Sequence, residues 1–270
     1  QEQQRVALAA GEGEVGVAGE PVGAGGRRVR GGLRRRGGRL GGAARAAQPG
    51  EQTRWISPEN PTGAKGAGAR ENKGAKGHAW DRMQPGEAYV LSDVKGAGTI
   101  DRMWLTIEDR SPEALRGLKL EIFWDGARRP AVSVPFGDFF LHGAGEMVPM
   151  ETALLASPEG RSFVSYIPMP FRRGARIVVT NESGRPVNLI FYDINYRSLP
   201  AQPEDALYFH AWWSREQATR LGRDFRILPR IEGRGRFLGG EVPDRADQLA
   251  ELRRQPAAVR TPHLSQVPRG

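Results

Sequence analysis

The chain has 270 residues, of which 39% are hydrophobic and 26% are charged, with no cysteine and a formal net charge of +9. The lack of cysteine excludes disulfide bonds, thiolate metal sites and a cysteine nucleophile. No apolar run is long enough to span a bilayer as a helix and no signal-peptide pattern is visible, so we expect no membrane partner, while a bacterial cytoplasmic or a secreted location both stay open.

The aromatic residues divide the chain into three parts. All 21 of them lie between Trp55 and Phe237, while residues 1–54 and 241–270 contain none. A segment without rings or a sustained apolar pattern cannot bury enough surface to offset its conformational entropy. We therefore expect one folded domain over residues 55–240, a disordered leader over 1–54 and an unrelated tail over 241–270.

Residues 1–54 are rich in glycine, alanine and arginine, and ten arginines against five acidic residues give them more than half of the net charge. Their Arg-Gly pairs are similar to a nucleic-acid-binding arm, in which arginine neutralises phosphates and stacks on bases. Such arms usually contain aromatic residues, and none occurs here. A disordered leader and translation of GC-rich DNA in the wrong frame are the alternatives, and we expect no nucleic-acid partner.

A glycine-rich stretch follows Trp55. Two prolines and repeated glycines between residues 57 and 77 exclude a regular helix or a central strand. The stretch is not a phosphate-binding loop, because no Gly-Lys pair is followed by Ser or Thr. Since long loops in compact domains are often functional, the candidate substrate-binding residues here are Trp55, Glu59, Asn60 and Lys65.

From residue 88 the sequence alternates between apolar and polar positions, as β-strands do. Turn signals separate the alternating segments, and Asp125-Gly126 is the strongest hairpin signal among them. This pattern predicts an all-β, jelly-roll type β-sandwich, with helices expected only at Ser111–Gly117 and after Trp213. The predicted strands are Ala88–Ser92, Gly98–Ile107, Leu118–Trp124, Ala131–Phe136, Ser162–Met169, Arg176–Thr180, Val187–Tyr196 and Leu207–Trp213.

The segment from Ala131 to His142 ends a predicted strand and then presents a carboxylate, two rings and an imidazole. Such a strand end can furnish a ligand cleft, but it can also be a corner of the core. Further along, Trp212-Trp213 puts one ring on each face of a strand, so that one ring belongs in the core and the other could line a cleft. These segments add further candidate binding residues: Asp138, Phe139, His142 and Trp212.

The residues needed for metal or serine chemistry are not suitably spaced. Four scattered histidines without His-x-x-x-His spacing argue against a zinc site, and no Gly-x-Ser-x-Gly elbow is present. We expect no metal and no cofactor. A glycosidase needs two carboxylates on either side of one bond. The carboxylates in expected loops are Glu59, Asp81, Asp138, Glu146 and Asp193, although Asp138 could instead accept backbone N–H bonds in its turn.

After Glu216 the apolar pattern loosens. Phe237-Leu238-Gly239 predicts the start of one more strand, and Asp244–Arg254 could form a short amphipathic helix. Nothing obvious completes the sheet that these residues would join.

Five motifs occur in the order found in a known family. They are Ser-Pro-Glu-Asn-Pro-Thr-Gly-Ala-Lys-Gly (57–66), Gly-Thr-Ile-Asp-Arg-Met-Trp-Leu-Thr (98–106), Pro-Phe-Gly-Asp-Phe-Phe-Leu-His-Gly (135–143), Tyr-Ile-Pro-Met-Pro-Phe (166–171) and Leu-Tyr-Phe-His-Ala (207–211). Over residues 55–240 the chain resembles the family once called DUF2961 and now classed as glycoside hydrolase family 172. The resemblance implies the first half of a double jelly roll, assembly into trimers or hexamers, and retaining hydrolysis of α-fructofuranosides or D-arabinofuranosides by two glutamates.

In that family the two glutamates lie in the second half, in a Trp-Gly-Glu-Gly-like strand and a Gly-Thr-Glu-Asp-Tyr-like motif, and neither occurs here. We therefore assign no catalytic residue. We expect a truncated furanosidase-type glycoside hydrolase that recognises a furanoside glycan and is inactive by itself. The alternative is a non-catalytic carbohydrate-binding or assembly module in which Trp55, Phe139 and Trp212 stack on sugar.

Overall fold

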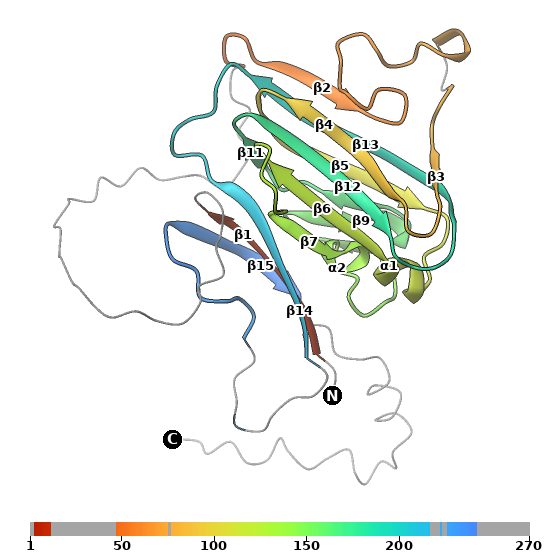
Figure 1. The fold of residues 1–270 in the computed structure, drawn as a ribbon, viewed down its shortest axis with the longest axis vertical. Coiled ribbons are helices and arrows are strands. Elements are labelled where there is room, and N and C mark those ends of the chain that lie inside the picture. The colour runs from red at the N-terminus through yellow and green to blue at the C-terminus, as the bar shows by residue number, and fades with distance from the viewer. Residues whose placement is uncertain (1–2, 12–46, 75–76, 217–221, 223–225, 242–270) are drawn as a thin grey trace, which may run out of the picture.

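The computed structural model describes residues 3–11, 47–74, 77–216, 222 and 226–241. These residues form two β-sheets that enclose a shared hydrophobic core as a β-sandwich (Figure 1). The predicted all-β sandwich is thereby confirmed. None of the helices in the described ranges is long and apolar enough to cross a membrane.

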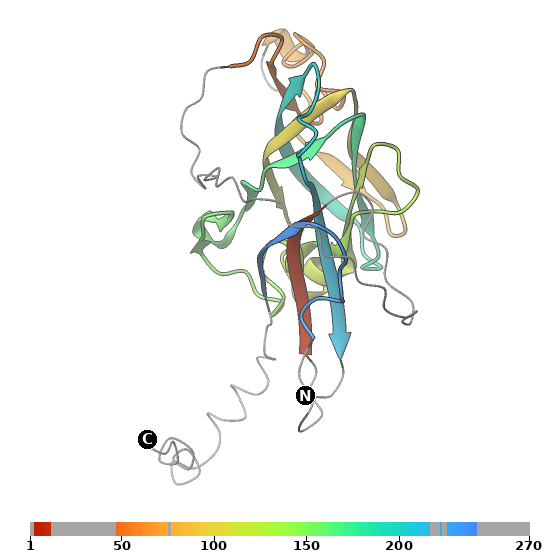
Figure 2. The same cartoon turned by 90° about the vertical axis from the view of Figure 1, so that its left-hand side faces the viewer.

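The first sheet has seven strands and joins the two ends of the described chain. Its strands pair antiparallel, except for β14 and β7, which run parallel where Ala211 lies opposite Val132. Three of its strands, β1, β14 and β15, extend beyond the rest of the sandwich (Figures 1 and 2). In spatial order the strands are β15 (Gly235–Glu241), β1 (Gln3–Gly11), β14 (Tyr208–Glu216), β7 (Val132–Pro135), β6 (Leu118–Trp124), β12 (Gly174–Asn181) and β4 (Ala88–Lys95).

The second sheet has eight strands. Two of them are short and lie off the main path, where β11 pairs with β5 and β3 pairs with β13. In spatial order the main path is β2 (Gln52–Ile56), β13 (Val187–Leu199), β5 (Ala97–Ile107), β10 (Phe163–Ser165), β9 (Leu155–Ser157) and β8 (Met150–Glu151); the short strands are β11 (Met169–Phe171) and β3 (Asp81–Met83).

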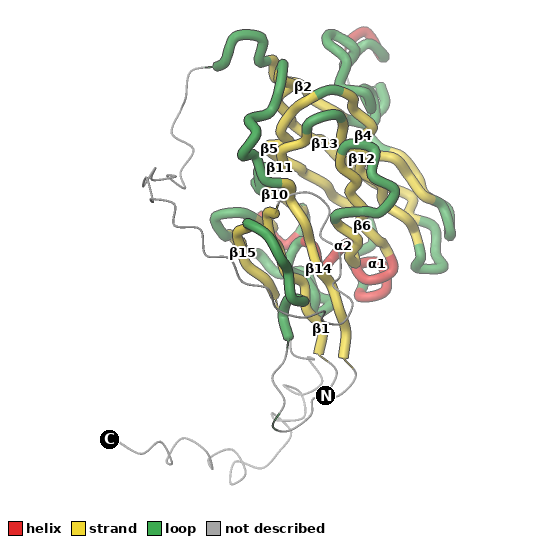
Figure 3. The backbone as a smooth tube through the Cα atoms, turned by 60° about the vertical axis from the view of Figure 1, so that its left-hand side comes forward, coloured by secondary structure: helices red, strands yellow, loops and turns green. Residues whose placement is uncertain are grey.

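Two short helices lie near β6 at one end of the sandwich (Figure 3). The helix predicted over Ser111–Gly117 is confirmed as α1 (Pro112–Gly117). Ser111 caps it, because its hydroxyl accepts the N–H of Ala114 at 3.3 Å, and proline occupies the first helical position. A single turn, α2 (Phe136–Phe139), follows β7 directly. The 3-10 turns are η1 (Asn72–Gly74) and η2 (Pro158–Gly160).

Strand β6 shows how the alternating pattern determines the fold. Its apolar residues Leu118, Leu120, Ile122 and Trp124 are buried, and the residues between them are partly exposed. The chain then turns at Asp125-Gly126 and returns as β7. Both turn residues have positive φ, 57° and 79°, as a type I′ hairpin turn requires. The predicted hairpin is confirmed.

The strands β2, β3, β8 and β9 were not predicted. Two further differences have a clear physical cause. Residues Gln3–Gly11, which we assigned to the leader, form β1, with Leu8 buried in the core. The aromatic content did not reveal this strand, since its apolar residues are only valine, alanine and leucine. The strand predicted over Ser162–Met169 divides into β10 and β11, because the chain leaves the ladder between them: the N–H of Tyr166 donates to the carbonyl oxygen of Leu154, and the N–H of Ile167 donates to Oγ of Ser165.

The ends of the chain give three further comparisons. The strand predicted at Phe237–Gly239 is present as β15, and β14 continues to Glu216, where we expected helix after Trp213. Residues 12–46 of the leader and the helix expected at Asp244–Arg254 lie outside the described residues.

Candidate functional site

The eight candidate residues occupy three separate places in the fold. The first place is β2 with the loop after it, the second is α2 with the turn after it, and the third is the outer face of β14. In that order the residues are Trp55, Glu59, Asn60 and Lys65; Asp138, Phe139 and His142; and Trp212. The structure therefore does not bring all the candidates together in one cleft.

The glycine-rich loop (residues 57–80) connects two strands, β2 and β3, that both pair with β13. β2 ends at Ile56, opposite Ile194 of β13, and β3 begins at Asp81, opposite Ile190 of the same strand. The two ends of the loop therefore lie beside positions only four residues apart on β13. Long loops within compact domains are frequently functional.

Asn60 holds the first half of this loop in shape. It is 6% exposed, and its Nδ2 donates to the carbonyl oxygens of Trp55 and Ala64 at 3.1 Å each. Its Oδ1 accepts the N–H of Ala64 at 3.0 Å. In the same turn Gly63 has a φ of 62°, and a Cβ there would lie 2.9 Å from the ring of Tyr196. The amide of Asn60 is thus used within the loop.

Asn60→Ala is expected to lower the free energy of unfolding by about 2 kcal/mol, because three partly buried hydrogen bonds of the loop are lost together. Urea denaturation measures this change, and amide exchange at Ala64 reports the loop itself. The exposed Lys65 gives the control, since Lys65→Ala should change stability by less than about 0.5 kcal/mol. Equal effects of the two substitutions would show that Asn60 does not organise the loop.

The other candidate residues in this place differ in their exposure and in whether they form hydrogen bonds within the loop. The carboxylate of Glu59 accepts the backbone N–H of His78 at 3.1 Å, and this bond is the main cause that lowers the pKa of Glu59. Lys65 is exposed, and Trp55 is 43% exposed at the end of β2. Trp55 is therefore the residue in this place that offers a large, uncommitted surface to a ligand.

Helix α2 directs its rings into the core. Phe136, Phe139 and Phe140 are all 0% exposed. The centroids of Phe139 and Phe140 lie 4.9 Å apart at 79°, and those of Phe136 and Phe163 lie 4.7 Å apart at 73°. Both arrangements are edge-to-face contacts typical of aromatic packing. Phe139 is thus part of a core corner and is not exposed to a sugar.

Next to these rings, two carboxylates approach one guanidinium. Asp138 is 2% exposed, and its Oδ2 lies 3.5 Å from Nη2 of Arg116. Arg116 also donates to the carbonyl oxygen of Gly143 at 2.6 Å, and the N–H of Gly143 donates to Oε2 of Glu241 at 3.1 Å. Burial is the main cause that raises the pKa of Asp138 to about 6 and that of Glu241 to about 7. Both carboxyls therefore exchange protons near neutral pH.

This acidic cluster is closed to substrate. His142 is 1% exposed, its ring packs against Phe163 at 5.8 Å, and burial lowers its pKa, so that the imidazole is neutral at pH 7. A glycosidase needs its two carboxylates on either side of an accessible bond. Asp138 is only 2% exposed, so Asp138 and Glu241 do not flank an accessible bond. Within the described ranges no group of three metal-binding side chains occurs.

Trp212 lies apart from both places. Phe209 of the same strand is part of the core. Ala211 and Trp213, the neighbours of Trp212 along the strand, are partly buried and pack against the core. Trp212 is partly exposed, and alternation along β14 turns it to the opposite face from Phe209. The sequence prediction of one ring on each face thus agrees with the burial of this strand.

The remaining candidate carboxylates have separate partners. Oδ1 of Asp81 lies 2.7 Å from Nε2 of His78, and its other oxygen accepts the hydroxyl of Tyr89. Asp193 pairs with Arg102 on the second sheet, and Glu146 is exposed. These carboxylates therefore have different neighbours and form no pair around one bond.

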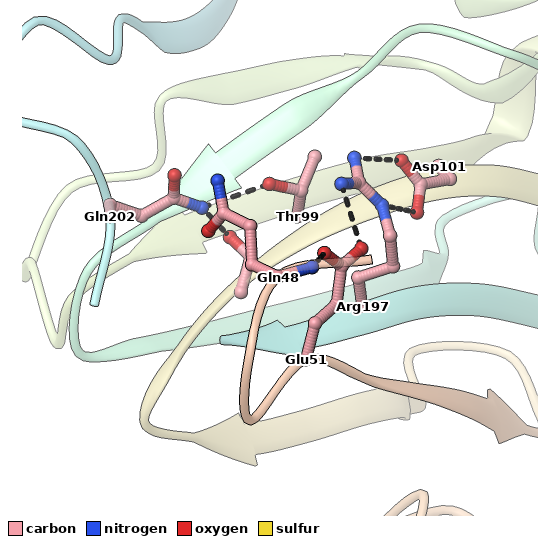
Figure 4. Close-up of polar contacts among 7 residues, drawn as sticks. Gln48, Glu51, Thr99, Asp101, Arg197 and Gln202 are labelled. Carbon is pink, nitrogen blue, oxygen red and sulfur yellow. Dashed lines mark hydrogen bonds and ion pairs between the residues drawn. The ribbon is translucent and has the colours of Figure 1, made fainter. Parts of the chain in front are cut away.

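A β-bulge turns two consecutive charged residues onto the outer face of the second sheet. The register between β5 and β13 shifts at Asp101, so that Asp101 and Arg102 are both partly exposed between buried neighbours. Asp101 accepts two hydrogen bonds of 2.7 Å from Arg197, and Glu51 accepts a third from the same guanidinium at 3.2 Å (Figure 4). A fixed network of charges therefore covers this part of the sheet.

Sequence reasoning missed the residues that complete these clusters: Arg116, Glu241, Arg102, Asp101, Arg197 and Glu51. One signal for the sheet residues was available, since Asp101-Arg102 places two charged residues side by side within a strand pattern that otherwise alternates. Nothing in the local sequence connects Arg116 or Glu241 with Asp138, because the three residues come from α1, β15 and α2.

Comparison with known proteins agrees with this fold. A family model described as GH172 first beta-sandwich domain matches residues 50–208, which is more than half of the chain. The matched range contains the glycine-rich loop, α2 and every strand of the second sheet. A search of curated proteins found no match.

Proposed function

The chain belongs to glycoside hydrolase family 172, and from this membership we propose that it is the first β-sandwich of a retaining furanosidase acting on α-fructofuranosides or D-arabinofuranosides. The observation that carries the proposal is the match over residues 50–208. A retaining enzyme forms a glycosyl-enzyme intermediate on one carboxylate and uses a second carboxylate as acid and base.

These 270 residues do not supply that catalytic pair. Neither glutamate motif of the second half of the family occurs in the sequence. The two carboxylates that influence each other electrostatically, Asp138 and Glu241, do not supply it either, because Asp138 is only 2% exposed. We infer that hydrolysis needs the second half of the enzyme, and that this chain by itself recognises sugar without cleaving it.

The test compares this chain with an extended protein. The coding DNA past Gly270 is read in all three frames, and the sequence that carries the two glutamate motifs is joined to the sandwich. We expect the extended protein to hydrolyse nitrophenyl furanosides with retained configuration, and the 270-residue chain to release no nitrophenol. Hydrolysis by the chain alone, absence of both motifs in every frame, or an inactive extended protein that carries them would each contradict the proposal.

A carbohydrate-binding or assembly module is the second candidate, and exposed apolar side chains favour it. Val148 and Tyr166 are 48% and 47% exposed, and they lie in the connections around β8 and β10 at one edge of the second sheet. Exposed apolar residues of this size are common where another molecule binds. In the proposed trimer or hexamer, a neighbouring copy would cover them.

A further inference from the structure

Five side chains form a band across the outer face of the second sheet. Trp55 of β2 lies opposite Asn195 of β13, which in turn lies opposite Arg102 of β5. Asp193, two residues before Asn195 in β13, lies opposite Trp104, two residues after Arg102 in β5. We call these residues the tryptophan band: Trp55, Asn195, Arg102, Asp193 and Trp104.

The band faces away from the core. Ile56, Ile194 and Met103, each the neighbour of a band residue along its strand, are at most 1% exposed. Since successive side chains of a strand point to opposite faces, the band residues point outward. Their partial or full exposure agrees with this direction. The face is therefore open to a ligand within the described part of the chain.

Indole rings border the band at two ends. Trp55 is 43% exposed and Trp104 is partly exposed. The two residues are two strands apart and two residues apart along the strand direction, which places their backbones roughly 12 Å from each other. Tryptophan offers a large apolar face with little loss of conformational freedom, which suits the C–H face of a sugar ring. The spacing fits more than one ring of a short oligosaccharide.

Fixed polar groups lie between the rings. Arg102 donates through Nη1 to Asp193 and, at 3.0 Å, to Oδ1 of Asn195. Among the described residues nothing bonds to Nη2 of Arg102, Nδ2 of Asn195 or Oδ2 of Asp193. Two hydrogen-bond donors and one acceptor are therefore held side by side and can each form a further hydrogen bond. Hydroxyl groups both donate and accept, so a polyhydroxyl ligand can use all three atoms.

The charge of the face favours a neutral ligand. Arg102 and Asp193 neutralise each other, and the adjoining Arg197 is paired with two carboxylates, Asp101 and Glu51 (Figure 4). In the band and in the network beside it each arginine is paired with a carboxylate, so these side chains offer no unpaired cation to an anionic glycan. A protein partner is also disfavoured, because it would have to remove water from these ion pairs, and the centres of protein interfaces are depleted of charged residues.

We propose that the tryptophan band binds a neutral, furanose-containing oligosaccharide. Trp55 and Trp104 stack on sugar rings, and Arg102, Asp193 and Asn195 bind the hydroxyls between them. The proposal rests on the proposed function for the identity of the sugar, but it needs no residue outside the described sheet. Binding can therefore be measured on the 270-residue chain without any hydrolysis.

The test compares two tryptophans of similar exposure. Trp80 is 36% exposed and lies outside the band, with the guanidinium of Arg82 5.5 Å from its ring. Fructo-oligosaccharides and arabino-oligosaccharides are titrated into the full chain by calorimetry. We expect Trp55→Ala to weaken binding about tenfold or more, as loss of a buried aromatic contact does. Trp80→Ala should leave the affinity within about twofold, and Asn195→Ala should weaken it severalfold.

Several results would overturn the proposal. They are the absence of binding to both oligosaccharide classes, equal losses in Trp55→Ala and Trp80→Ala, or tighter binding of an acidic oligosaccharide. Light scattering on the same samples measures the oligomeric state. If Trp55→Ala dissociates an oligomer and leaves the sugar affinity unchanged, the band is a contact between copies of the chain. Circular dichroism confirms that each variant is folded.

The two proposals fail in different ways. An extended protein that cleaves furanosides while the band binds no sugar refutes the band alone. Sugar binding that depends on Trp55, together with an extended protein that cleaves nothing, refutes the hydrolase proposal alone.

Discussion

Phe139→Ala is expected to lower the free energy of unfolding by about 3–5 kcal/mol, the usual cost of removing an aromatic ring from a packed core. Phe139 is 0% exposed, and its ring packs edge-on against Phe140 and Phe209 at centroid distances of 4.9 and 6.1 Å. The alanine variant leaves a cavity between two sheets whose hydrogen-bonded strands cannot close it. Urea denaturation at fixed pH measures the loss.

Two further variants separate packing from binding. Phe139→Leu refills much of the cavity, so it should cost clearly less than alanine. Trp55→Ala removes a larger ring from the surface and should change stability by less than about 1 kcal/mol. A Phe139→Ala chain that unfolds at the wild-type urea concentration but no longer binds sugar would instead assign Phe139 to a binding cleft.

Glu241→Gln is expected to stabilise the chain at about pH 8 and to flatten its stability profile between about pH 5 and pH 8. The pKa of Asp138, about 6, and that of Glu241, about 7, both exceed the values near 4 of carboxyls in an unfolded chain. Between these values the folded state holds protons that the unfolded state has released. The free energy of unfolding therefore falls as pH rises through this window. A pKa shift of this size corresponds to on the order of 3 kcal/mol for one carboxyl.

Charged and titratable groups near Asp138 and Glu241 also contribute to the pH dependence of stability. The guanidinium of Arg116 attracts both carboxylates and so lowers their pKa values. His142 has a lowered pKa and acts in the opposite direction, because the folded state resists its protonation as pH falls. The difference between wild-type and Glu241→Gln profiles removes the contribution of His142.

Urea midpoints at about pH 5, 6.5 and 8 provide this comparison. Glu146→Gln, a substitution at an exposed carboxylate, should give a profile parallel to that of the wild type. A Glu241→Gln profile that is equally parallel would show that the pair of Asp138 and Glu241 does not cause the pH dependence.

Local sequence was sufficient to predict elements whose structure depends on interactions within one short segment. The alternation of Leu118–Trp124 predicted β6 to the residue, and Asp125-Gly126 predicted the turn that follows. Ser111 and the proline after it predicted the start of α1. In each case the interacting atoms lie within a few residues of one another, so a short window contains the physical cause.

The sites depended on residues that are far apart along the chain. Gly143 and Glu241 are 98 residues apart and share a hydrogen bond, and Arg102 and Asn195 are 93 residues apart and share another. Our prediction placed Glu241 in an unrelated tail, and it left the direction of the Phe139 side chain open between a cleft and the core. Pairing across the sheets settled both positions.

The sequence by itself determined most strands after residue 88, the turn at Asp125-Gly126, the helix after Ser111 and the motifs of glycoside hydrolase family 172. Alternation along a strand states which of its residues share a face. It does not state which strand lies beside it, because that choice depends on the packing of segments from the whole chain. Only the tertiary structure placed Trp55 opposite Asn195 and brought Asp138 within electrostatic reach of Glu241.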